Sequence, residues 1–179
     1  GISHITAADF AYAKKLGRAV KLLAVSRRAG DTFTVRVAPY LLSEEHPLFA
    51  VHGVMNAVYV VGNMLGPSMY YGSGAGSLPT ASAVVGDLVY MARHAKHPSV
   101  IRWSKEKIEL GTQERPYQNF LRTILSAEDI GKIFPVAETV DAGIGGESGV
   151  ITEAMTEQEY QSAAAQMTDG DLLQRLRLA

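Results

Sequence analysis

The stretch YYGSGAGSLPTASAVVGD, residues 70–87, joins a predicted strand to a predicted helix through a run of alternating glycines. The three glycines are Gly72, Gly74 and Gly76. Glycine leaves the backbone amides of such a turn unobstructed. Ser77 is suited to cap the helix that follows, and Pro79 is tolerated in a first helical turn.

Two interpretations of this loop stay open on the residues alone. It is a purely structural corner between strand and helix, or its backbone lines a ligand site, since a helix start attracts anions. The spacing does not match the dinucleotide-binding fingerprint with its long gap before the third glycine. No Lys-Ser or Lys-Thr follows, as it would in a P-loop.

The segments before this loop alternate between helix and strand patterns. Thr6 and Asp9 form a capping box that predicts a helix over residues 7–16. Residues 19–27 are strongly apolar and residues 32–37 alternate strictly, which predicts two paired strands. Residues 55–63 and 68–72 flank the turn sequence NMLGP and predict a second antiparallel pair.

After the glycines, apolar residues recur at helical spacing and predict one buried helix face. These residues are Ala81, Val84, Val85, Leu88, Ala92 and Ala95. Residues 99–116 are rich in charge and are expected to form a connector. Residues 117–179 follow as a small α+β unit with helices capped at Ser126 and Thr156, and between those helices we expect one good strand.

These patterns predict the α+β class. We expect a mixed or antiparallel sheet covered by helices on one face, together with the small C-terminal unit. A net charge of −1 leaves no basic excess for nucleic acid. The absence of cysteine excludes disulfides and thiolate sites and suits the cytoplasm. Apolar runs fall short of the roughly 20 residues that span a bilayer, so no membrane association is expected.

Isolated polar residues add little specific chemistry. His94 and His97 have helical i, i+3 spacing, but their place at a helix end suits the helix dipole, and no metal site is expected. No serine lies in a G-x-S-x-G elbow. Asn56, in VMNAV, either orients a group in a cleft or satisfies neighbouring backbone.

Two long segments together resemble one known family. GISHITAADFAYAKKLGRAVKLLAVSRR and HPLFAVHGVMNAVYVVGNMLGPSMYYGSGAGSLPTASAVVGDLV, in this order, resemble the catalytic portion of bacterial homoserine dehydrogenase with an ACT domain. The resemblance implies a substrate and dimerisation domain over residues 1–98, a connector over 99–116, and a ferredoxin-like ACT domain over 117–179. That last unit departs from the family pattern, because SAEDIGKI stands where a Pro-Gly turn is usual.

The resemblance implies an oxidoreductase that interconverts aspartate semialdehyde and homoserine with NAD or NADP, on the route to threonine and methionine. In that family the nucleotide-binding domain and a catalytic Asp and Lys lie upstream of the segment that begins here. No catalytic residue is therefore assigned, and we expect this fragment to be inactive and to bind no cofactor alone. The resemblance implies cofactor contacts, in the whole enzyme, at Gly74, Ala75, Gly76 and Thr80.

The expected partners are a second copy of the chain and a small amino acid. Residues 19–25 and 55–61 are apolar on both strand faces, so a homodimer formed through the sheet would cover one of them. The amino acid is the substrate of the family or a regulatory effector. The alternative function is a stand-alone module for amino-acid binding of the ACT type, or for dimerisation.

Overall fold

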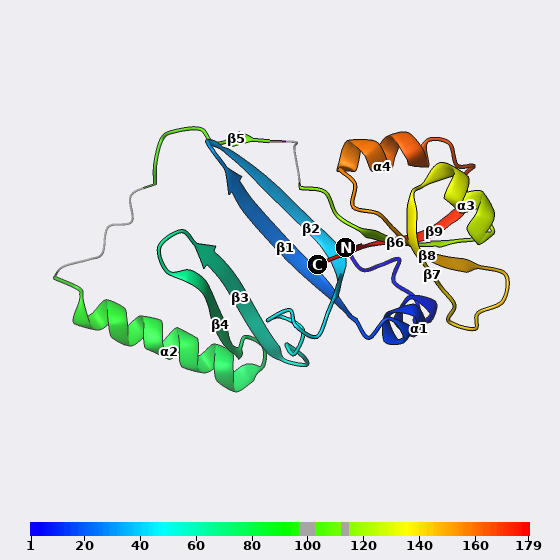
Figure 1. Ribbon diagram of the computed structural model, residues 1–179. Helices are drawn as coiled ribbons and strands as arrows, with labels where there is room; N and C mark the ends of the chain where they lie inside the picture. The colour runs from blue at the N-terminus through cyan, green and yellow to red at the C-terminus, as the bar shows by residue number, and fades with distance from the viewer. Residues whose placement is uncertain (97–102, 112–114) are drawn as a thin grey trace. The chain divides into compact units, whose positions relative to one another are not determined.

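The computed structural model describes residues 1–96, 103–111 and 115–179. A seven-stranded mixed sheet contains six strands in the order β1-β2-β9-β6-β8-β7, and β5 pairs with β2 beside this path. Two further strands, β3 and β4, form a separate antiparallel hairpin. The predicted α+β class with a mixed sheet is confirmed (Figure 1).

The elements follow one another along the chain with these bounds: α1 (Ala7–Lys15), β1 (Ala19–Ala29), β2 (Thr32–Leu42), β3 (Met55–Gly62), β4 (Gly66–Ser73), α2 (Ser77–Arg93), β5 (Glu109–Leu110), β6 (Asn119–Thr123), α3 (Ala127–Ile133), β7 (Val136–Val140), β8 (Ser148–Thr152), α4 (Glu157–Ala164) and β9 (Leu172–Leu178). Both predicted hairpins are present, β1 with β2 and β3 with β4.

The starts of α1, α3 and α4 are fixed by local side-chain caps, as the sequence predicts, whereas α2 begins after the N-cap residue Gly76 without the cap expected from Ser77. The Thr6 amide donates to Asp9 Oδ2 at 2.7 Å, which closes the capping box of α1. Ser126 Oγ accepts from the Asp129 amide at the start of α3. Thr156 and Glu159 form a second capping box at the start of α4.

Adjacent residues of the central strands pack into separate hydrophobic clusters on the two sides of the sheet. Phe120 of β6 packs with Tyr12 of α1, whereas the neighbouring Leu121 packs with Ile130 of α3 and Tyr160 of α4. Helices therefore cover both faces of this part of the sheet. From the sequence we expect helices on one face of the sheet only, because no local pattern indicates that α1 packs against the C-terminal strands.

The chain divides into two compact units. One contains Gly1–Phe49 together with Ile108–Ala179, and the other contains Ala50–Lys107. The first unit joins β1 and β2 to the C-terminal strands in one sheet through parallel pairing of β2 with β9. The domain boundaries expected near residues 98 and 116 remain a prediction, and residues 99–102 and 112–114 of that connector lie outside the described residues.

Two sequence expectations are wrong. No residue of α2 is buried, and Val84, Val85 and Leu88 of the predicted inward face are each more than half exposed. A helix beside one two-stranded hairpin has too little partner surface to bury an apolar face of this length. Between α3 and α4 the chain forms two strands, β7 and β8, where one was expected.

Within the described residues, no helix is both long enough and apolar enough to cross a membrane. The longest described helix is α2, with 17 residues.

Candidate functional site

The glycine loop lies between the end of β4 and the start of α2. Gly74 and Ala75 follow Ser73, the last residue of β4, and Gly76 is the N-cap residue of α2. All of these residues are exposed. The structure thus brings three of the four predicted cofactor contacts into one short turn, and it places the fourth, Thr80, in the first turn of the helix.

Gly74 is held against the side chain of Asn56. A Cβ atom at position 74 would lie 2.3 Å from Asn56 Nδ2, so a side chain there would require Asn56 to move. The Asn56 amide donates to the Val54 carbonyl at 3.2 Å. Asn56 thus satisfies neighbouring backbone, which is one of the two interpretations that its sequence left open.

Gly76 has a backbone conformation that other residues adopt with strain. Its φ angle is 111°, which lies in the region that favours glycine. Thr80 Oγ1 donates to the Gly76 carbonyl at 2.8 Å, so this hydroxyl stabilises the first helical turn. The oxygen lone pairs of Thr80 remain acceptors, and α2 has no acidic residue in its first turn.

The sequence places His94 and His97 at the end of a helix, and the structure describes only the first of these two residues. His94 Nδ1 lies 2.8 Å from the Tyr90 carbonyl, and the two rings stack with centroids 4.2 Å apart. His97 lies outside the described residues. Across the described ranges, no group of three or more His, Cys, Asp or Glu side chains is arranged to hold a metal ion.

A buried ion pair connects α1 to the C-terminal strands. Arg122 of β6 donates from Nη1 to Asp9 Oδ1 and to Thr6 Oγ1, each at 2.8 Å. Asp9 is fully buried and Arg122 is nearly so. Glu147 lies on the other side of the guanidinium, with Oε2 3.5 Å from Arg122 Nε. Two residues 113 positions apart in the sequence are thereby joined.

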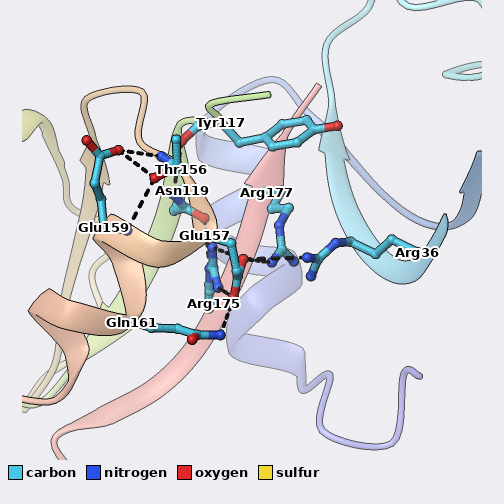
Figure 2. A network of polar contacts seen from close by, with 9 residues as sticks. All are labelled: Arg36, Tyr117, Asn119, Thr156, Glu157, Glu159, Gln161, Arg175 and Arg177. Carbon is cyan, nitrogen blue, oxygen red and sulfur yellow. Dashed lines mark hydrogen bonds and ion pairs between the residues drawn. The ribbon is translucent and has the colours of Figure 1, made fainter. Parts of the chain in front are cut away.

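A second polar cluster surrounds Glu157 at the start of α4 (Figure 2). Arg175 of β9 donates from Nη1 and Nη2 to the two oxygens of this carboxylate, both at 3.0 Å. Arg177 donates to Oε2 at 2.5 Å, and Arg36 of β2 lies 3.7 Å from the same oxygen. Three guanidinium groups from two strands therefore share one carboxylate.

The environment of this cluster fixes its charge state. Burial opposes ionisation of Glu157, but hydrogen bonds from Arg175 and Arg177 outweigh it and lower the pKa of this carboxyl from 4.5 to about 2. Burial lowers the pKa of Arg175, and the hydrogen bond to Glu157 opposes that change. The Arg175 guanidinium also lies 3.3 Å from the ring centroid of Tyr160.

Sequence analysis missed both ionic clusters. The strand sequence LLQRLRL did carry one usable signal, because its two arginines alternate with leucine and must lie on the same face of the strand. Nothing local indicates that Glu157 is the partner of these arginines, or that Asp9 is the partner of Arg122. Those pairings depend on strand order, which is a property of the tertiary structure.

Comparisons with known proteins point to one family. The family model described as homoserine dehydrogenase matches residues 1–89. A homoserine dehydrogenase from Bacillus subtilis is 48% identical over 96 residues, which are 54% of this chain and 22% of that protein. One from Helicobacter pylori is 34% identical over 131 residues, which are 73% of this chain and 31% of that protein.

Solved structures match along the whole chain. A homoserine dehydrogenase from Thiobacillus denitrificans superimposes with a TM-score of 0.76 and 33% identity, covering 100% of this chain and 46% of that one. A Staphylococcus aureus homoserine dehydrogenase at pH 7.0 matches with a TM-score of 0.72 and 25% identity over the same shares.

The α+β fold, which includes the strand, glycine loop and helix of residues 66–93, matches the fold of solved dehydrogenase chains. The chain belongs to the homoserine dehydrogenase family. It spans about half the length of the solved structures that it matches, and the aligned residues make up between a fifth and a third of the curated relatives.

We expect the Glu157 cluster to make folding stability depend on pH between about 4.5 and 2. The unfolded carboxyl binds a proton below its ordinary pKa, whereas the folded carboxyl stays ionised down to about 2. Stability from this group is thus complete above pH 4.5 and is lost as the pH falls through that window. Replacing Glu157 with Gln should remove this pH dependence, which amounts to about 1–3 kcal/mol in the free energy of unfolding.

Urea unfolding of the chain and of Glu157→Gln at pH 7, 4 and 3 measures this difference. Glu138→Gln is the matched control, because Glu138 is exposed on β7. A gap between the parent chain and Glu157→Gln that stays constant over this pH range would contradict the assigned role of Arg175 and Arg177.

Proposed function

We propose that this chain forms the substrate-domain scaffold of a homoserine dehydrogenase, the enzyme that interconverts aspartate 4-semialdehyde and homoserine with NAD or NADP in threonine and methionine biosynthesis. The observation that carries the proposal is the glycine loop at the start of α2, within the segment that the family model matches. The chain lacks cysteine, which suits a reducing compartment, and we place the enzyme in the cytoplasm.

The loop has the properties that a nicotinamide cofactor requires of a neighbouring backbone. Gly74 carries no side chain and is seated on Asn56, and Gly76 has a positive φ angle that turns the chain into α2. A planar ring and its ribose can approach such a backbone closely. We therefore assign Gly74, Ala75 and Gly76 to cofactor contact, with Thr80 fixing the turn and offering a hydroxyl oxygen.

The chemical roles divide between this chain and the rest of such an enzyme. When bound, the nicotinamide donates or accepts the hydride. The residues of this chain hold the loop rigid, because β4 and α2 anchor both of its ends. The family resemblance places the substrate-binding Asp and Lys outside these 179 residues, so we expect the 179-residue polypeptide alone to show no turnover and to bind no nucleotide tightly.

An exchange experiment tests the assignment of the loop. The 96-residue matching segment of the Bacillus subtilis homoserine dehydrogenase is replaced by the corresponding residues of this chain. We expect this chimera to oxidise homoserine. Gly76→Val in the chimera should raise the KM for the nicotinamide cofactor about tenfold while leaving the KM for homoserine nearly unchanged, because the substitution alters only the cofactor-facing backbone.

Gly86→Ala is the matched control, since its Cβ atom would meet nothing within 4 Å. Thr80→Val removes the hydroxyl without disturbing a positive φ angle and should raise the cofactor KM less than Gly76→Val does. A folded chimera with no activity would contradict the family function. An unchanged cofactor KM in Gly76→Val would contradict the loop assignment.

We further propose that the chain forms a homodimer through the β3–β4 sheet. Val58 of β3 and Tyr70 of β4 are cross-strand neighbours, and both side chains are more than 60% exposed. Val60, two residues beyond Val58 on the same face of β3, adds to this apolar surface. Exposed apolar patches of this kind on a sheet are typical of protein interfaces. A second copy of the chain would cover them.

Light scattering on the purified chain tests the dimer. We expect twice the chain mass of 19.3 kDa at micromolar concentration, and a single chain mass for the double variant Val58→Lys, Tyr70→Lys. Ile124→Lys is the control, because Ile124 is equally apolar and exposed but lies in the C-terminal unit. A monomeric parent chain, or a double variant that remains dimeric, would contradict this interface.

A further inference from the structure

A small open pocket on one face of the β1–β2 hairpin is lined by three arginines and, among the described residues, by no carboxylate. Its polar lining consists of Arg27, Thr34, Arg36, Tyr40, Arg115 and Tyr117. All of these residues belong to the unit formed by Gly1–Phe49 and Ile108–Ala179. Neither the family assignment nor the proposed function uses this pocket.

The strand register explains why these side chains meet. Arg27 of β1 pairs with Thr34 of β2, and two positions further along Val25 pairs with Arg36. Because side chains two residues apart share a face of a strand, Arg27, Thr34 and Arg36 lie on one face of the hairpin. Tyr40, four positions beyond Arg36, lies on that face too.

Residues 115–117 complete the pocket from outside the hairpin. The ring of Tyr117 packs against that of Tyr40, with centroids 6.0 Å apart. The Arg115 guanidinium lies 4.7 Å from the Tyr117 ring centroid, so its charged group is held beside the pocket. Both tyrosines are buried, whereas Arg27 and Arg115 are exposed.

Positive charge predominates among the described side chains that line this pocket. Arg36 already has partners, because the Glu157 carboxylate lies 3.7 Å away and itself accepts hydrogen bonds from Arg175 and Arg177. In the parts of the chain that the structure describes, neither Arg27 nor Arg115 forms an ion pair. The local balance therefore favours a negatively charged ligand.

Two neighbouring groups respond to this environment. Burial, and after it the positive charge of Arg115, lowers the pKa of His46. Burial and the neighbouring Tyr117 raise the pKa of Tyr40 to about 12, so its hydroxyl stays protonated at neutral pH. Hydroxyl and guanidinium groups are the donors that carboxylate and phosphate oxygens require.

We propose that this pocket binds a small oxyanion, the carboxylate or phosphate group of a solute, between Arg27, Arg36 and Arg115. Guanidinium groups bind both kinds of oxyanion through paired N–H donors, and Val25, on the same face, offers apolar contact to the remainder of the ligand. The site is separate from the glycine loop in sequence, and it stands whether or not the proposed dehydrogenase function does.

Titration of the 179-residue chain with sodium phosphate and, separately, with sodium acetate tests this site. Ionic strength is held constant with sodium chloride, and the arginine side-chain N–H signals are followed by nuclear magnetic resonance. We expect saturable shifts of the Arg27 and Arg115 signals with at least one anion below about 50 mM. Saturation with phosphate alone identifies a phosphate site, and saturation with acetate identifies a carboxylate site.

Variants separate this pocket from general surface charge. Arg27→Gln and Arg115→Gln should each weaken binding at least about tenfold, and because both side chains are exposed, the fold should be retained, as circular dichroism will verify. Arg93→Gln, on α2, is the matched control and should leave binding unchanged. Absence of saturation with both anions, or equal weakening by Arg93→Gln, would overturn the proposal.

Discussion

The structure of the larger unit depends on one buried ion pair, between Arg122 of β6 and Asp9 of α1. Asp9 also caps its own helix through the Thr6 amide, so the arginine binds a carboxylate that is already fixed in place. A buried charge without its partner is costly, which ties the position of α1 to that of β6. Tyr12 then packs on Phe120, and a Cβ atom at Gly149 would lie 2.5 Å from the Tyr12 ring.

This arrangement makes the first helix and the C-terminal strands parts of one core. The segment that matches the family model begins with α1 and continues into β1 and β2, and β2 pairs with β9 from the other end of the chain. The Glu157 cluster reinforces the same junction, since Arg36 comes from β2 and Arg175 and Arg177 come from β9.

Features with local causes could be predicted from the sequence. The capping boxes at Thr6 and Thr156 and both hairpins depend on residues a few positions apart, and all are present.

Features with distant causes could not be predicted from the sequence. The apolar spacing of α2 indicates an inward face, but burial requires a covering surface that residues 50–107 do not supply. The partners of Arg122 likewise depend on the order of strands in the sheet. The glycine loop was recognised from its residues, whereas its support by Asn56 required the structure.

A double-mutant cycle on Asp9 and Arg122 tests the central claim most directly. The free energy of unfolding is measured by urea denaturation for the parent chain, Asp9→Asn, Arg122→Met and the double variant. We expect Arg122→Met alone to cost about 3–5 kcal/mol and the pair to show a coupling energy above about 1 kcal/mol. Additive effects to within about 0.5 kcal/mol would contradict the account, because they would mean that α1 is held in place without this ion pair.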